Sequence, residues 1–217
     1  MINAAFPSES VQITSGQTRL AGTLELPPSP RGLVLFAHGS GSSRLSPRNS
    51  FVAGELRRAG LGTMLLDLLS AEEESGDRHR FDIALLSARL GDAVLWLAQQ
   101  PQTSGLALGL FGASTGAAAA LQLAAGRPES VAAVVSRGGR PDLAGDDDLA
   151  RVRAPTLLIV GGEDHTVVEL NRQALRDLTC EKELVVVRGA THLFEEPGAL
   201  PEVARLAARW FRGYLAA

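Results

Sequence analysis

The sequence predicts an α/β fold in which a mostly parallel β-sheet carries helices on both faces. Short, continuous apolar segments such as 32–40 and 154–162 have the length and composition of buried parallel strands. Between them lie longer segments, for example 81–100, whose apolar residues recur at helical spacing. This alternation of strands and helices is typical of a parallel sheet that is covered on both sides.

The predicted elements follow one another along almost the whole chain. Alternating segments with β-branched residues at 11–15 and 19–27 predict a hairpin that opens the sheet. Further strands are expected at 32–40, 61–69, 106–112, 131–136, 154–162 and 182–187. Helices are expected at 49–60, 81–100, 114–125, 167–178 and 201–215. The polar segments 70–80 and 138–150 are expected to be loops, and they are the two places where a small lid could form.

Length and composition favour a single domain that spans residues 1–217, with no large cap domain. The net charge of -3 gives no electrostatic reason to expect a nucleic acid or an acidic membrane surface as partner. The single cysteine, Cys180, excludes an intrachain disulfide and fits a reducing compartment. No signal-peptide pattern and no apolar run of about 18 residues is present, so we expect a cytoplasmic protein without membrane segments.

Ser114 is the first candidate catalytic residue. It lies in the stretch Gly-Ala-Ser-Thr-Gly at 112–116, where a predicted strand becomes a predicted helix. Glycines on both sides allow a sharp turn in which a larger side chain would clash with neighbouring backbone. Such a turn lifts the serine Oγ above the carboxyl edge of the sheet and directs the N–H groups of the next helix toward it. The pattern therefore predicts a nucleophile, although by itself it also fits an ordinary glycine-rich turn.

A nucleophilic serine needs a base, and the base needs an acid that orients it. His192 follows the last predicted strand and is therefore expected at the same sheet edge as Ser114. The histidines less suited to this role are His38, His79 and His165. Asp164 follows the strand 154–162 and is the predicted acid, with Glu163 and Asp142 as alternatives. As an alternative role, Asp164 could cap the helix 167–178.

Further candidates lie in the loops at this edge. Backbone N–H groups of Thr115 and Ser40 are predicted to form the oxyanion hole, with Gly41 as the alternative to Ser40. Arginines at the same edge could bind an anionic substrate, chiefly Arg44 and Arg137, with Arg48 and Arg140 nearby. The alternative is that these arginines are solvated or form salt bridges with Asp142 or the acidic run 72–74. Asp67 is expected to brace the loops by hydrogen bonds.

Taken together, these motifs resemble the α/β-hydrolase superfamily, and more narrowly its dienelactone hydrolase-like group. The matching stretches are HGSGSS at 38–43, LLDLL at 65–69, GASTG at 112–116, GGEDHTV at 161–167 and GATHLF at 189–194. The resemblance implies an eight-stranded, mostly parallel sheet, a Ser114–His192–Asp164 triad, hydrolysis of an ester-like bond, and no cofactor or metal. Enzymes of this group that hydrolyse dienelactone use a cysteine nucleophile, whereas this chain has Ser114.

The sequence thus predicts a serine hydrolase that acts on small carboxylic esters or related acyl compounds through an acyl-enzyme. Two alternatives stay open. One is an acyltransferase or thioesterase that uses the same triad, and the other is a non-catalytic scaffold that keeps the fold. A homodimer is also possible, because Trp210, Phe211 and Tyr214 of the last helix could join a subunit interface.

Overall fold

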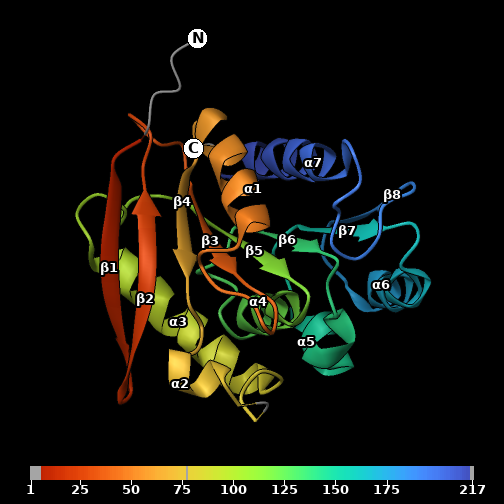
Figure 1. Cartoon of the computed structure of the whole chain (residues 1–217), viewed down its shortest axis with the longest axis horizontal. Helices are drawn as coiled ribbons and strands as arrows, with labels where there is room; N and C mark the ends of the chain where they lie inside the picture. The colour runs from red at the N-terminus through yellow and green to blue at the C-terminus, as the bar shows by residue number, and fades with distance from the viewer. Residues whose placement is uncertain (1–5, 77, 216–217) are drawn as a thin grey trace.

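The computed structural model describes residues 6–76 and 78–215. In this part of the chain, eight strands form one sheet in the order β1-β2-β4-β3-β5-β6-β7-β8 (Figure 1). The hairpin strands β1 and β2 pair antiparallel, β2 pairs antiparallel with β4, and the other neighbours are parallel. The strands are β1 Ser8–Ser15, β2 Thr18–Glu25, β3 Leu33–Ala37, β4 Gly62–Leu66, β5 Leu108–Ala113, β6 Ala133–Arg137, β7 Thr156–Gly161 and β8 Lys182–Val187. The predicted eight-stranded α/β-hydrolase architecture is confirmed.

Helices cover both faces of the sheet. In Figure 1, α1 and α7 lie above the sheet, and α3, α4 and α6 lie below it. Because the chain crosses between the two faces as it adds parallel strands, every strand end at the carboxyl edge continues into a loop and then a helix. The helical segments are α1 Pro47–Arg58, α2 Ala71–Glu74, α3 Ile83–Gln99, α4 Thr115–Gly126, the 3-10 turn η1 Pro141–Ala144, α5 Asp146–Arg151, α6 His165–Asp177 and α7 Ala199–Tyr214.

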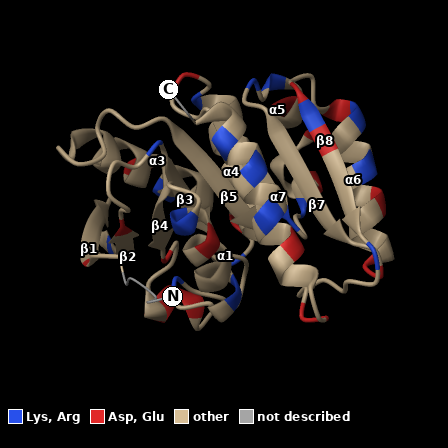
Figure 2. Cartoon of the chain, turned by 90° about the horizontal axis from the view of Figure 1, so that it is seen from above, with Lys and Arg blue, Asp and Glu red and all other residues tan. Residues whose placement is uncertain are grey.

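Two apolar layers hold the helices against the sheet. Successive strand residues alternate between them. Leu35 of β3 belongs to the layer between the sheet and helices α3 and α4, and Phe36 belongs to the layer between the sheet and helices α1 and α7. Phe36 and Phe111 of the neighbouring strand β5 pack with ring centroids 4.8 Å apart. Charged residues gather on the outer surfaces of α6 and α7 and on the edge strand β8, whereas the central strands carry few (Figure 2). The central strands are therefore a rigid, buried support for the loops at their ends.

The last helix, α7, is part of this core. Phe211 is fully buried and Trp210 is 7% exposed, and the indole N–H of Trp210 donates to the Pro155 carbonyl at 3.2 Å. These two side chains stabilise the fold of the single chain and are not available to a second subunit. A homodimer through this surface would have to use Tyr214, which is partly exposed.

Two segments that the sequence analysis expected to be loops contain short helices. In 70–80, Ser70 Oγ accepts the N–H of Glu73 and the Glu73 carboxylate accepts the N–H of Ser70, and this capping box stabilises the start of α2. In 138–150, η1 and α5 form, and α5 carries three aspartates in its first turn, where they interact favourably with the helix dipole. Both segments are polar because they lie at the surface, and that polarity concealed their helical signals. Residue 77 of the first segment lies outside the described residues.

The described strands also end earlier than the apolar runs in the sequence. β4 ends at Leu66, although Leu68 and Leu69 beyond it remain buried. β3 ends at Ala37, so His38 and Ser40 lie in the loop that follows. Apolar composition continues past the strand ends because these loop residues pack into the core. Within the described ranges, no helix combines the length and the apolar character needed to cross a lipid bilayer.

Candidate active site

Ser114 stands in a strained backbone conformation between β5 and α4. Its φ of 50° and ψ of -120° lie in a region that residues with a side chain rarely adopt. Such conformations cost about 1–3 kcal/mol and persist only where the surrounding structure enforces them. The Ser114 N–H donates to the Arg137 carbonyl of β6, and the Ser114 carbonyl accepts the N–H of Arg140 at 3.1 Å. The serine is thus held at the carboxyl edge of the sheet by the neighbouring strand end.

The two glycines of the turn are required by close packing. A Cβ at Gly112 would lie 2.4 Å from Cα of Ala117, and a Cβ at Gly116 would lie 2.3 Å from the carbonyl oxygen of Ala37. Both contacts are with backbone atoms, which cannot move aside as a flexible side chain can. The glycines therefore let α4 begin directly against β3 and β5, and the start of α4 lies at Ser114.

Asp164 and His192 form the closest contact of the candidate site. His192 Nδ1 and Asp164 Oδ2 are 2.6 Å apart, a short hydrogen bond between residues that follow β7 and β8. The Asp164 side chain is 18% exposed and the His192 side chain is 41% exposed. A carboxylate at Nδ1 holds the proton on that nitrogen and leaves Nε2 free to accept another proton.

The structure separates Asp164 from the alternative acids. Asp164 occupies the N-cap position of α6, yet its side chain makes no capping hydrogen bond and turns to His192 instead. Glu163 is exposed, and its backbone N–H donates to the Ala190 carbonyl. Asp142 forms a two-point ion pair with Arg140. Of these three carboxylates, Asp164 is the one positioned to orient the histidine.

Ser114 and His192 lie on either side of the segment that follows β6. A Cβ at Gly138 would be 3.6 Å from His192 Cε1, and Gly138 comes directly after Arg137, whose carbonyl holds Ser114. Within residues 6–76 and 78–215, no hydrogen bond joins Ser114 Oγ to His192 Nε2. Catalytic hydrogen bonds are often long in the free enzyme and shorten when substrate binds, so this geometry is compatible with a serine–histidine pair.

The predicted oxyanion donors, Ser40 and Thr115, are directly connected. The N–H of Ser40 donates to Oγ1 of Thr115 at 2.9 Å. The sequence analysis assigned this N–H to the oxyanion, whereas in the structure it is bonded to the Thr115 hydroxyl. Thr115 is the first residue of α4, where backbone N–H groups have no partner within the helix. The Thr115 hydroxyl is a contact that the sequence analysis did not identify, because nothing local shows that it reaches the loop after β3.

His38 supports the loop that carries Ser40. Its Nε2 accepts the N–H of Leu68 at 3.0 Å, and its Nδ1 lies 2.9 Å from the Gly39 carbonyl. Both ring nitrogens are therefore engaged, with Nδ1 as the donor, and the buried His38 links the ends of β3 and β4. This is a bracing role and not that of a catalytic base.

Of the two arginines proposed for substrate binding, Arg44 is already paired. Asp67 accepts both the backbone N–H and the Nη1 of Arg44, at 2.6 Å and 3.0 Å, so Asp67 braces this loop as expected. Arg137 is different, because it is buried and its Nε and Nη1 have no hydrogen-bond partner. Burial, and secondarily the nearby positive charge of Arg48, lowers the pKa of Arg137 to about 10, so it remains charged at neutral pH.

No described group of three or more His, Cys, Asp or Glu side chains has an arrangement that could hold a metal ion.

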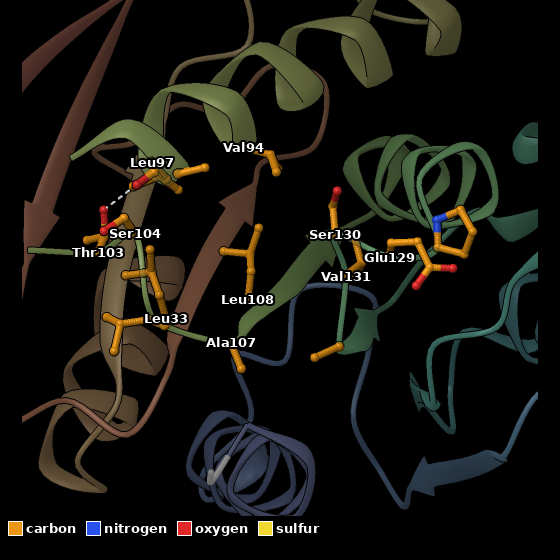
Figure 3. Close-up of a pocket in the computed structure, with 14 residues that line it drawn as sticks. Leu33, Val94, Leu97, Thr103, Ser104, Ala107, Leu108, Glu129, Ser130 and Val131 are labelled. Carbon is orange, nitrogen blue, oxygen red and sulfur yellow. Dashed lines mark hydrogen bonds between the residues drawn. The ribbon is translucent and has the colours of Figure 1, made fainter. Parts of the chain in front are cut away.

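A separate cavity of about 470 Å³ lies at the opposite edge of the sheet. Figure 3 shows that side chains of α3 such as Val94 and Leu97 line it together with Leu33 and Leu108 from the amino ends of β3 and β5. Ser114 follows the other end of β5, about 20 Å away at the usual rise per strand residue. This cavity is consequently not part of the candidate site.

Comparisons of the sequence and the structure with known proteins agree with the fold and point to one family. Residues 73–214 match the family model described as the dienelactone hydrolase family. The crystal structure of a dienelactone hydrolase from Anabaena variabilis is 55% identical and has a TM-score of 0.93, with 97% of this chain and 99% of that chain covered. A dienelactone hydrolase-like promiscuous phosphotriesterase from metagenomic libraries is 19% identical, with a TM-score of 0.80 over 98% of this chain and 100% of the other, which shows the shared fold.

Two proteins from strains of Mycobacterium tuberculosis, provisionally named as phosphoribosyl transferases, are 57% identical to the chain over 207 residues. The match covers 95% of this chain and 46% of each of those proteins, so the chain spans about half the length of these relatives. The extent of the family-model match and the full-length likeness to the Anabaena protein agree with the eight-stranded fold and the sequence motifs. This chain belongs to the dienelactone hydrolase family.

Proposed function

We propose that the protein is a serine hydrolase that cleaves small carboxylic esters or related acyl compounds. Ser114 attacks the carbonyl carbon, and His192 Nε2 takes the hydroxyl proton and then gives it to the leaving alcohol. Water, activated by the same histidine, hydrolyses the resulting acyl-enzyme. Asp164 orients His192 and stabilises the imidazolium that forms.

The observation that carries this proposal is the 2.6 Å hydrogen bond between Asp164 and His192, at the same sheet edge as the strained Ser114. The hydrogen bond supports an Nε2 that can accept a proton, and the strain at Ser114 supports a serine held in place for a reaction. The 41% exposure of the His192 side chain also gives water access to the base, as hydrolysis of an acyl-enzyme requires.

The N–H of Thr115 at the start of α4 is the proposed first donor for the oxyanion, and the second is the Ser40 N–H or the Thr115 hydroxyl that accepts from it. In other serine hydrolases, the loss of one such donor costs about 3–4 kcal/mol of transition-state stabilisation. The proposed arrangement therefore contains each part that acyl-enzyme chemistry requires.

The names of the relatives support this proposal to different degrees. The Anabaena protein is named as a dienelactone hydrolase, and it is similar to this chain over its whole length. The transferase name belongs to proteins about twice as long, and the residues described above supply a nucleophile, a base and an acid suited to hydrolysis. Because the proposed nucleophile is Ser114 and not a cysteine, we do not propose dienelactone itself as the substrate.

The first test is labelling with a fluorophosphonate probe, together with hydrolysis of p-nitrophenyl acetate and butyrate. We expect wild-type protein to be labelled and active, and Ser114→Ala to lose both signals while its circular dichroism spectrum stays unchanged. Ser130→Ala is the matched control, because Ser130 is exposed at the opposite edge of the sheet. Folded wild-type protein that is neither labelled nor active would refute the proposal. Product analysis with an added alcohol as competing acceptor would show whether acyl transfer exceeds hydrolysis.

A further inference from the structure

Four arginines of the carboxyl edge were considered for substrate binding, and of these Arg137 is the one without an acidic partner among the described residues. Arg44 pairs with Asp67, Arg140 pairs with Asp142, and Arg48 pairs with Glu195. Arg137 is 8% exposed, and no carboxylate of the described residues forms an ion pair with it. An unpaired buried charge is costly, so an anion that binds to Arg137 would stabilise it.

Arg137 lies directly beside the proposed nucleophile. Its Cα pairs with that of Ala113 across β5 and β6, one residue before Ser114, and its carbonyl accepts the Ser114 N–H. Its guanidinium lies over the ring of Phe194, with 5.9 Å from Cζ to the ring centroid, and Phe194 follows His192 by two residues. Arg137 therefore adjoins the serine through its backbone and carries its charge against Phe194, close in sequence to the histidine of the candidate site.

Arg48 adds a second positive charge to this place. It lies in the first turn of α1, and its partner Glu195 directly follows Phe194, the residue whose ring lies under the Arg137 guanidinium. The positive charge of Arg48 also contributes to the lowered pKa of Arg137. The Nε of Arg48 has no hydrogen-bond partner, while its Nη1 donates to Glu195 at 2.8 Å. The Glu195 side chain is 62% exposed, so its ion pair with Arg48 is on the solvent side and is weakened by water. An anion bound near both guanidinium groups would reduce the repulsion between them.

We infer that Arg137 and Arg48 form a subsite for an anionic group, a carboxylate or a phosphate, on the substrate that is attacked by Ser114. The inference rests on the proposed function for the attack itself, and it specifies which substrates the site prefers. Planar guanidinium groups bind both anions through paired hydrogen bonds, and the buried Nε and Nη1 of Arg137 have no hydrogen-bond partner within the protein. The proposed subsite contains Arg48 in place of Arg44, which the sequence analysis had named beside Arg137. The reason is that the Arg44 side chain already forms an ion pair with Asp67.

The kinetic test compares two p-nitrophenyl esters of equal chain length. One is mono-p-nitrophenyl adipate, which carries a carboxylate, and the other is the neutral p-nitrophenyl hexanoate. We expect a higher kcat/KM for the anionic ester in wild-type protein, and we expect Arg48→Gln and Arg137→Met to lower the ratio of the two kcat/KM values by about tenfold. Glu195→Gln should raise the ratio, because it removes the acid that competes for Arg48.

Arg212→Gln is the control for net charge, because Arg212 is exposed on α7, and it should leave the ratio unchanged. If Arg137→Met does not fold, the opposite effects of Arg48→Gln and Glu195→Gln still decide the matter. A wild-type ratio at or below one, or ratios that both of these variants leave unchanged, would overturn the subsite.

A binding measurement separates the subsite from the hydrolase proposal. Free adipate and inorganic phosphate are each titrated at constant ionic strength, and the melting temperature of the wild-type protein and of Arg48→Gln is followed. A rise in the melting temperature of the wild-type protein that is smaller in Arg48→Gln supports the subsite even if no ester is hydrolysed. The anion that raises the melting temperature more shows whether a carboxylate or a phosphate is preferred. If no ester is hydrolysed and neither anion raises the melting temperature, both proposals fail. If esters are hydrolysed, the kinetic ratio decides.

Discussion

The backbone N–H of Ser40 donates to Oγ1 of Thr115 at 2.9 Å, which joins the loop after β3 to the first residue of α4. A hydroxyl that accepts this bond has its own proton free to donate. In the proposed reaction, the oxyanion would have one donor from the Thr115 backbone and a second from either the Thr115 hydroxyl or the Ser40 N–H.

Substitution of Thr115 tests whether this hydroxyl matters for catalysis. Thr115→Val keeps the shape of the side chain and removes the acceptor, so we expect kcat for p-nitrophenyl butyrate to fall about tenfold with little change in KM. Thr115→Ser retains the hydroxyl and should stay within about threefold of wild type by the same estimate. Equal activities of the two variants would show that the hydrogen bond does not position the oxyanion donors.

Asp164→Asn tests the orientation of the histidine. The amide can no longer hold the Nδ1 proton of His192 as a carboxylate does, and in a related triad this change lowers kcat by about 10⁴. We expect a loss of about 10³–10⁴ here, with the melting temperature nearly unchanged because the side chain makes no capping bond to α6. The matched control is Glu163→Gln, the adjacent and exposed acid, which should keep its activity. A large loss in the control, or none in Asp164→Asn, would contradict the assignment.

Gly116→Ala tests the close packing at the start of α4. The added Cβ would lie 2.3 Å from the Ala37 carbonyl oxygen, so either the helix or β3 must shift. Overpacking of this kind costs about 1–3 kcal/mol or more, and we expect a lower free energy of unfolding together with a loss of esterase activity. Gly126→Ala at the other end of α4 is the control, because a Cβ there meets no atom within 4 Å. Urea unfolding should show the control at or slightly above wild-type stability, by about 0.4–1 kcal/mol.

The ion pair of Glu73 and Arg89 predicts a pH-dependent stability. Hydrogen bonds from Arg89 lower the pKa of Glu73 from 4.5 to about 2, and Arg89 itself is buried with 5% of its side chain exposed. Because the folded pKa lies below the unfolded value, the stabilisation is complete above about pH 4.5 and is lost as the pH falls toward 2.

Urea unfolding of wild type and Glu73→Gln at pH 7, 4 and 2.5 checks this expectation. The variant should be less stable by about 2 kcal/mol at pH 7, and the difference should shrink as the pH falls. Glu72→Gln in the same short helix is the control, since Glu72 is exposed. A difference that is independent of pH would mean that the charge of Glu73 does not contribute.

The sequence by itself determined the order of the elements and the edge at which the chemistry lies. Buried strands and amphipathic helices are recognised from local periodicity, and in a parallel sheet the residues after each strand meet at one edge. Ser114, Asp164 and His192 could therefore be placed together before any contact was known. The short helices at 71–74 and 146–151 were missed, although Ser70 and Glu73 carry a capping-box signal that a closer examination of the polar segment could have found.

The tertiary structure decided which neighbours these residues have. Asp164 and Glu163 are adjacent in sequence, and only the packing of the loops after β7 and β8 brings Asp164 to His192. In the same way, the sequence treats Arg44 and Arg137 alike, whereas the fold pairs the first with Asp67 and buries the second beside Ser114 without an acid. Hydrogen bonds and ion pairs between distant segments depend on side-chain directions across the sheet, and no local pattern of residues encodes those directions.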